Sequence, residues 1–263
     1  MKAITSAANP AFKAWLRLAT QPRTARGQRR ALAEGLHLAQ AAFDAGMPVE
    51  AVLRRHGSRG AEIEAVCARA VGEGAAAYEL AAALYDRLSP VERGAGVMLV
   101  LGLPSVALPS RSAGDLVYLD GVQDPGNVGT LLRTAAAAGV RNVYASPTTA
   151  AFWAPKTLRA GQGAHFRLRL IEHVDPPALA DALSGPWFGA DARGGEPLWT
   201  LPLPSGPVGW IFGAEGAGLS PAARAACRAL VTVPIDSAVE SLNVAAAAAV
   251  CLFERRRRLR PSP

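Results

Sequence analysis

From residue 115 onward, short apolar runs alternate with longer amphipathic stretches. Short apolar runs bounded by turn residues predict buried strands, whereas apolar residues at positions i, i+3 and i+4 predict helices. Regular alternation of the two predicts an α/β domain with a mostly parallel sheet, which binds ligands at the carboxyl ends of its strands. The predicted strands are Leu116–Leu119, Asn142–Ala145, Leu168–Ile171, Trp187–Ala190, Val208–Phe212 and Leu230–Val233, and the predicted helices are Asn127–Ala138, Pro177–Leu183, Pro221–Ala229 and Leu242–Arg256.

The first hundred residues have a similar but shorter pattern. Leu36–Ala45 and Ile63–Val71 are predicted helices, and Val49–Leu53 and Val97–Leu101 are predicted strands. This mixture predicts a small α/β/α layered domain. A stretch rich in Pro, Gly and Ser then interrupts both periods and is predicted to be a linker. The predicted organisation is therefore a domain over residues 1–102, a linker over 103–114 and a second domain over 115–263.

The composition narrows the class of protein. Half of the 263 residues are apolar and 19% are charged, which is enough for a core and unlike a disordered chain. The longest apolar run, Val244–Phe253, is too short to cross a bilayer, and the first residues lack the apolar segment of a signal peptide. The cysteines (Cys67, Cys227 and Cys251) are odd in number and widely spaced. We therefore expect a cytoplasmic protein without a disulfide framework or a metal site.

The charge balance points to nucleic acid. The net charge is +7, and all but three of the 28 basic residues are arginine. Such a charge is typical of nucleic-acid binding, although an arginine-rich solvated surface gives the same count. Two basic clusters leave the same choice open, between a solvated helix face or a favourable helix dipole and an RNA backbone contact. They are Arg17, Arg23, Arg26, Arg29 and Arg30 near the start, and Arg255, Arg256, Arg257, Arg258 and Arg260 at the end.

Three loops each follow a predicted strand and open a helix, a position that gathers backbone N–H groups. The first, Asp120–Thr130, lacks the Lys-Ser/Thr pair of a P-loop and is not G-x-G-x-x-G. Asn127 is predicted to be the N-cap of the following helix. Arg133 lies among leucines and alanines, so it is either a snorkelling surface residue or a residue directed at a ligand.

The second and third loops carry further candidates. Gly213–Gly218 has three glycines that allow a close approach of the backbone to a ligand, but in an order that argues against a nicotinamide site. Its Glu215 is either a helix cap or a ligand contact. In the third loop, Ser241 is a candidate N-cap and Asn243 falls in the first turn of an apolar helix. The alanine run 245–249 allows that helix to pack very closely within or between subunits.

Together these segments resemble one family. N-V-G-T-L-L-R-T-A from Asn127, F-G-A-E-G-x-G-L-S from Phe212 and V-P-I…E-S-L-N-V from Val233 occur in this order. They resemble the SpoU (TrmH-like) RNA ribose methyltransferases of the SPOUT class over about residues 115–258. The first hundred residues resemble the L30e-like substrate-binding domain often found ahead of the catalytic one. Alanine at 214 and serine at 237 stand where many relatives have asparagine and glycine.

The resemblance implies a trefoil-knotted α/β domain, a homodimer and S-adenosylmethionine as methyl donor. It implies that the donor is held by main-chain groups of Gly213, Val233 and Leu242, with Ile235 beside them. It also implies a set of functional side chains. They are Asn127, Arg133, Glu215, Ser241 and Asn243.

The expected reaction is methyl transfer to a ribose 2′-OH, with 23S ribosomal RNA the expected substrate and tRNA the alternative. A hydroxyl this weakly acidic needs positioning and loss of its proton. The resemblance assigns the activation to Arg133 with an RNA phosphate, and an arginine serves first as phosphate anchor because it stays protonated. The histidines (His37, His56, His165 and His173) are expected to be structural. Two other classes stay open: a non-catalytic RNA-binding protein, and a Rossmann-like enzyme, whose glycine motif after the first strand is missing.

Overall fold

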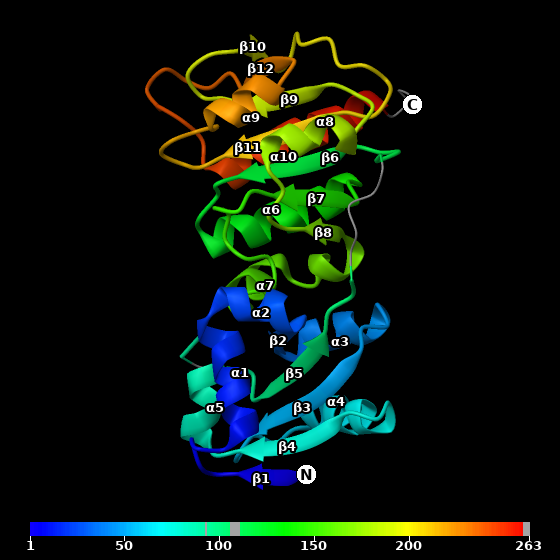
Figure 1. Ribbon diagram of the computed structural model, residues 1–263, viewed down its shortest axis with the longest axis vertical. Helices are drawn as coiled ribbons and strands as arrows, with labels where there is room; N and C mark the ends of the chain where they lie inside the picture. The colour runs from blue at the N-terminus through cyan, green and yellow to red at the C-terminus, as the bar shows by residue number, and fades with distance from the viewer. Residues whose placement is uncertain (93, 106–110, 260–263) are drawn as a thin grey trace. The chain divides into compact units, whose positions relative to one another are not determined.

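The computed structural model describes residues 1–92, 94–105 and 111–259, apart from the side chains of residues 22, 23 and 26, and divides into two compact units (Figure 1). The first unit holds residues 1–105 and 151–166, and the second holds the described residues of 106–150 and 167–263. Residues 106–110 of the predicted linker lie outside the description. The main difference from the predicted organisation is the segment 151–166, which packs with the first unit.

The first unit is built on a five-stranded mixed sheet in the order β1-β4-β3-β5-β2. β1, β4 and β3 run parallel to one another, whereas β5 is antiparallel to both β3 and β2. The strands are β1 (Lys2–Ile4), β2 (Arg30–Glu34), β3 (Val49–Arg55), β4 (Ala76–Leu80) and β5 (Val97–Gly102).

Helices cover both faces of this sheet, because successive strand residues point to opposite sides. Leu99 packs with Leu38 of α3 and Val66 of α4, and Met98 packs with Phe12 of α1 and Leu84 of α5. The result is the three-layer α/β/α arrangement that the pattern predicts. The helices of this unit are α1 (Pro10–Thr20), α2 (Pro22–Gln28), α3 (Leu36–Asp44), α4 (Ala61–Gly72), α5 (Ala82–Leu88) and α7 (Pro155–Gly161).

The second unit is a seven-stranded sheet in the order β10-β12-β9-β11-β6-β7-β8 (Figure 1). All of its strand pairs are parallel, which confirms the predicted parallel sheet. The strands are β6 (Leu116–Asp120), β7 (Asn142–Ala145), β8 (Arg169–Ile171), β9 (Trp187–Ala190), β10 (Glu196–Pro197), β11 (Gly209–Gly213) and β12 (Ala229–Thr232).

The helices of the second unit lie on the two faces of the sheet. Tyr118 and Ile211 pack with Leu179 of α8 and Ala223 of α9. On the other side α6 and α10 lie next to each other and run in the same direction, since Asn243 bonds to Asn127 at their first turns and Arg256 bonds to Ala137 at their last turns. The helical segments are α6 (Pro125–Ala138), η1 (Ala164–Arg167, shared with the first unit), η2 (Pro176–Ala178), α8 (Leu179–Ala182), α9 (Pro221–Ala226) and α10 (Val244–Leu259).

This topology brings loops that are distant in sequence together at one edge of the sheet. β6 and β11 are neighbours, and Asp120 at the end of β6 is in register with Gly213 at the end of β11. β9 lies between β11 and β12, so the loops after all four strands open at the same carboxyl edge. In an open parallel sheet this edge is where ligands bind. Within the described residues, no helix is long and apolar enough to cross a membrane.

Candidate functional site

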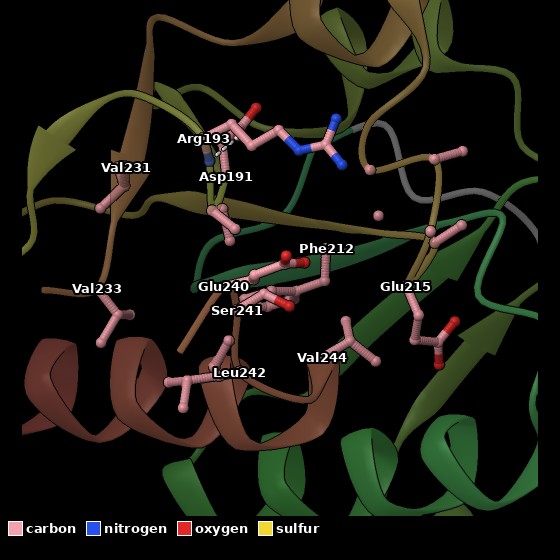
Figure 2. A pocket seen from close by; sticks show the side chains of 18 of the residues that line it. Asp191, Arg193, Phe212, Glu215, Val231, Val233, Glu240, Ser241, Leu242 and Val244 are labelled. Carbon is pink, nitrogen blue, oxygen red and sulfur yellow. Dashed lines mark hydrogen bonds between the residues drawn. The ribbon is translucent and has the colours of Figure 1, made fainter. Parts of the chain in front are cut away.

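A cavity of about 200 Å³ lies at this carboxyl edge (Figure 2). Three loops form its walls: residues 190–193 after β9, residues 212–218 at the end of β11, and residues from 231 to 247 between β12 and the first turns of α10. The last two of these are loops that the sequence singles out. The loop after β9 leads to β10 rather than to a helix, so it lacks the strand–loop–helix pattern that marks the other two in the sequence.

The loop after β11 is fixed by its glycines. Ala214 N donates to Gly218 O at 3.1 Å and Gly218 N donates to Ala214 O at 2.8 Å, which closes a tight loop. Gly218 has φ +69°, a conformation that favours glycine. A Cβ on Gly213 would lie 2.4 Å from the carbonyl carbon of Gly218. The glycines are therefore required by the shape of the loop, and this shape leaves its backbone exposed to the cavity.

A buried carboxylate links the loops after β6 and β11. The Asp120 side chain is buried, and its Oδ2 accepts the N–H of Ser220 at 2.6 Å. Ser220 in turn caps α9, because its Oγ accepts the N–H of Ala223. Asp120 therefore holds the far end of the glycine loop against β6. Its signal in the sequence is an acid at the end of a buried strand.

The predicted N-cap of α6 is wrong. The helix begins at Pro125, and Asp124 is its cap: Asp124 Oδ1 accepts the N–H of Asn127 at 2.7 Å. Proline favours the first helical position because it has no N–H to leave unpaired, which makes the preceding residue the cap. Asn127 is the third residue of the helix, so its side-chain amide is available for other contacts.

Ser241, the candidate N-cap of α10, does not cap the helix. Asn243 caps the helix, since its Oδ1 accepts the N–H groups of Ala245 at 2.9 Å and Ala246 at 3.3 Å. Ser241 is instead an exposed residue of the cavity wall. Asn243 is thereby held in one orientation by its own helix, with its amide nitrogen directed away from that helix.

Three of the predicted functional side chains form one hydrogen-bonded chain. Asn243 Nδ2 donates to Asn127 Oδ1 at 3.0 Å, and Asn127 Nδ2 donates to Glu215 Oε1 at 2.5 Å. The chain joins the first turns of α6 and α10 to the glycine loop and ends on a carboxylate at the cavity wall. Each asparagine uses one end of its amide as donor and the other as acceptor, so the direction of the chain is fixed. Glu215 is therefore not a helix cap, because its carboxylate accepts a hydrogen bond from Asn127.

The predicted donor-binding residues Gly213, Val233, Ile235 and Leu242 all line the cavity. The remaining wall is largely apolar and is supplied by strand ends and by α10. Charged residues that the sequence analysis did not select also line it. The apolar residues are Phe212, Val231 and Val244, and the charged ones are Asp191, Arg193, Arg224 and Glu240.

Arg133 stands apart from the other four functional candidates. It is exposed on α6 and does not line the cavity. At 3.6 residues a turn, it projects roughly 120° around the helix from Asn127. Its guanidinium makes no hydrogen bond or ion pair with the residues that the structure describes. Within one copy of the protein, Arg133 is therefore not part of the hydrogen-bonded series Asn243–Asn127–Glu215.

The histidines lie away from this cavity, and none of the four is among its lining residues. His165 is fully buried in the first unit, where its Nε2 lies 2.8 Å from Phe152 O. Burial lowers the pKa of His165 to about 4, so the ring is neutral near pH 7. Over residues 1–92, 94–105 and 111–259, no group of His, Cys, Asp and Glu side chains could hold a metal ion.

The arginines of the final helix have structural partners. Arg255 is 3% exposed and pairs with Asp115 at 2.9 Å, and Arg256 donates to Ala137 O at 2.6 Å. Arg257 pairs with Glu254 on the surface, and Arg258 donates to carbonyls of the loop 198–201. Arg260 lies outside the described residues. In the first cluster, Arg30 pairs with Glu50 and Arg29 donates to Leu103 O, and Arg17 is exposed. The side chains of Arg23 and Arg26 are not described.

The structure is that of an α/β protein with a parallel sheet and a cavity at its carboxyl edge, the place where such folds bind ligands. Residues 115–253 match the SpoU rRNA Methylase family. The chain belongs to this family, which confirms the resemblance drawn from the three motifs.

Relatives with known names extend this result to most of the chain. It is 31% identical over 260 residues to the 23S rRNA (guanosine(2553)-2'-O)-methyltransferase RlmP of Bacillus subtilis (strain 168), covering 97% of this chain and 100% of that one. It is 33% identical over 187 residues to the 23S rRNA (guanosine-2'-O-)-methyltransferase RlmB of Bordetella pertussis, covering 67% and 76%. The AdoMet-bound rRNA methyltransferase from Sinorhizobium meliloti superposes with a TM-score of 0.81 at 26% identity over 99% of both chains.

Proposed function

We propose that this protein is an S-adenosylmethionine-dependent RNA 2'-O-ribose methyltransferase that acts on 23S ribosomal RNA. The observation that carries the proposal is the hydrogen-bonded series Asn243–Asn127–Glu215, which ends at the wall of the cavity. It sets a fixed polar surface beside an apolar pocket that is bounded by exposed backbone. The 23S rRNA 2'-O-methyltransferases among the relatives support both the reaction and the substrate.

The cavity fits S-adenosylmethionine on its own chemistry. Apolar side chains such as Phe212, Val231 and Val244 suit an adenine ring, and charged side chains in the same cavity suit an amino-acid tail. The main chain of Gly213, Val233 and Leu242, with Ile235 beside it, would hold the donor. When bound, the donor supplies a methyl group on a positively charged sulfur.

The protein's own residues would bind and orient the acceptor ribose. Asn127 and Asn243 are each held on two sides, so they present fixed polar atoms and lose little freedom when RNA binds. Glu215 only accepts hydrogen bonds when ionised and would orient a donor such as a hydroxyl. Ser241 adds a hydroxyl at the cavity wall. Arg133 would anchor an RNA phosphate next to the reacting ribose and lower the cost of removing its proton.

The separation of Arg133 from the other residues supports a homodimer whose site is completed across the interface. Exposed apolar side chains lie at and just before α10: Leu242, two residues ahead of the helix, is 38% exposed, and Phe253 on the helix is 46% exposed. The small residues Ala246 and Ala249 lie between them. Ile235 and Val239 are exposed apolar residues of the preceding loop. The small residues would allow a second copy to approach closely.

The resemblance also implies a trefoil knot in the second unit and an L30e-like fold in the first. Both belong to this proposal, as do RNA binding by the first unit and a cytoplasmic location. The predicted domain boundaries at 102 and 115 belong to it too, with segment 151–166 moved to the first unit. An RNA substrate is consistent with the net charge of +7.

The test is transfer of labelled methyl from S-adenosylmethionine to unmodified ribosomal RNA, with tRNA in parallel. We expect label on 23S rRNA as one alkali-resistant ribose, and a loss of about 100-fold or more in rate for Arg133→Ala. Arg141→Ala removes another exposed arginine of this unit and serves as control. Label on tRNA alone would show that tRNA, and not ribosomal RNA, is the substrate. No label together with no calorimetric binding of the donor would refute the enzyme and leave an RNA-binding module.

A further inference from the structure

Five charged side chains line the cavity, and they differ in whether the protein already neutralises them. Asp191 forms an ion pair with Arg224, and Glu215 accepts the amide of Asn127. The side chains of Arg193 and Glu240 make no hydrogen bond or ion pair with any residue in the described part of the chain. The cavity therefore offers one spare cation and one spare carboxylate.

Arg193 is carried on a loop that is anchored at both ends. At the first end, Asp191 N donates to Val231 O at 2.9 Å and Thr232 Oγ1 donates to Asp191 O at 2.8 Å. At the second end, Gly195 (φ +147°) touches β12 so closely that a Cβ would lie 2.6 Å from the carbonyl carbon of Leu230. A turn fixed at both ends presents its side chain at low entropic cost, as a ligand-binding residue requires.

Asp191 also sets the position of Arg193 directly. Its Oδ1 accepts the N–H of Arg193 at 2.8 Å, while its Oδ2 is paired with Arg224. Both carboxylate oxygens are thus engaged, and the Asp191 side chain is only 7% exposed. Because Arg224 already balances this carboxylate, Asp191 does not compete for the guanidinium of Arg193. Figure 2 shows the Arg193 side chain extended over the cavity and Glu240 nearer its centre, beside Ser241.

We propose that Arg193 and Glu240 recognise the amino-acid tail of the methyl donor, Arg193 binding its carboxylate and Glu240 its ammonium group. This inference rests on the proposed function. An α-amino acid carries one negative and one positive group on the same carbon atom, which matches the two spare charges of the cavity. An arginine binds a carboxylate with two parallel N–H···O bonds, a geometry that favours it over other cations. The two residues would determine specificity through charge, whereas the main-chain groups hold the adenosyl part.

The test compares two ligands that differ only in the tail. S-Adenosylhomocysteine has the carboxylate and the ammonium group, and 5′-methylthioadenosine has neither. Titration calorimetry measures both with the wild type, Arg193→Gln and Glu240→Gln. We expect each variant to bind S-adenosylhomocysteine about tenfold more weakly and 5′-methylthioadenosine as the wild type does. Arg193→Lys should recover part of the loss.

Arg228→Gln is the matched control, because Arg228 is exposed in the same unit and does not line the cavity. It should bind both ligands as the wild type does, and thermal unfolding should show all variants folded. Equal weakening of both ligands, or no change for either, would overturn the proposal. Unchanged binding of S-adenosylhomocysteine with weaker RNA binding would assign Arg193 to an RNA phosphate instead. If the wild type binds neither ligand, the proposed function itself fails.

Discussion

The two ends of helix α10 use polar side chains in opposite ways. At its last turns, Arg255 and Arg258 bond to a carboxylate and to main-chain carbonyls of the same unit. At its first turn, Asn243 caps the helix and also extends a polar chain toward the cavity. The sequence leaves open whether the arginine end contacts RNA or favours the helix dipole. The contacts show that Arg255, Arg256 and Arg258 bond to groups of the same unit. A count of arginines therefore does not by itself indicate an RNA surface.

The largest effect on stability is predicted for a substitution at the arginine end of α10. Arg255→Met leaves Asp115 without its ion pair and leaves the carbonyls of Pro204 and Gly206 without a donor. Because the pair is largely buried, we expect a loss of about 3–5 kcal/mol in the free energy of unfolding, measured by urea denaturation. Arg257→Met is the control, since Arg257 is 71% exposed, and should change stability far less. Equal effects of the two variants would show that burial does not distinguish these arginines.

The fold is predictable from the sequence where a local pattern determines the structure, and not where the structure depends on distant residues. The parallel sheet follows from the sequence because its strands are buried on both faces and appear as short apolar runs. The predicted boundaries place segment 151–166 in the second unit, whereas it packs in the first, because a local pattern does not say which core a helix joins. Only the structure shows that Leu158 packs among residues of the first unit. Helix α1 is not among the predicted helices, because its lysine and arginine interrupt the apolar pattern of Phe12 and Trp15, which face the core.

The site was predictable in its residue types but not in its local roles. The sequence does not decide either N-cap by residue type alone, because each loop has two residues able to cap. For α6 the proline at 125 identifies Asp124 as the cap, whereas the third loop has no such marker. The hydrogen bonds among Asn127, Glu215 and Asn243 join residues more than 80 positions apart. No spacing rule within one loop can reveal such contacts.

A smaller effect is predicted for a substitution that disturbs the backbone of the glycine loop at the cavity. In Gly213→Ala the added Cβ meets the backbone of Gly218 at 2.4 Å, and backbone cannot move aside as a flexible side chain can. We expect a loss of about 1–3 kcal/mol in stability, as for other overpacked sites, together with weaker binding of S-adenosylhomocysteine. Gly216→Ala is the control within the same loop, because its Cβ meets nothing within 4 Å. Thermal unfolding and calorimetry should therefore separate the two variants, and a stable Gly213→Ala would contradict the packing argument.

A smaller effect separates the two roles of Asn243. Asn243→Ala removes both the cap and the bond to Asn127, and should cost about 1 kcal/mol of stability as well as activity. Asn243→Asp keeps a good cap but replaces the amide donor with an oxygen that faces Asn127 Oδ1. We expect its stability to stay near that of the wild type while methyl transfer slows by roughly tenfold. Wild-type activity in Asn243→Asp would mean that the polar chain serves only the helix.

The smallest predicted effect is a pH-dependent change in stability at the arginine end of α10. Hydrogen bonds from Arg257 and then Arg258 lower the pKa of Glu254 to about 2. A carboxylate whose pKa is lower in the folded than in the unfolded state stabilises the fold above its unfolded value of 4.5, and this contribution is lost as the pH falls toward 2. Glu254→Gln should therefore be less stable than the wild type at pH 7, and the difference should shrink between pH 4.5 and 2 in acid titrations of urea unfolding. Since Arg257 is 71% exposed, high salt should reduce the difference as well. A difference that stays constant across this range would show that Glu254 acts through packing at this turn rather than through its charge.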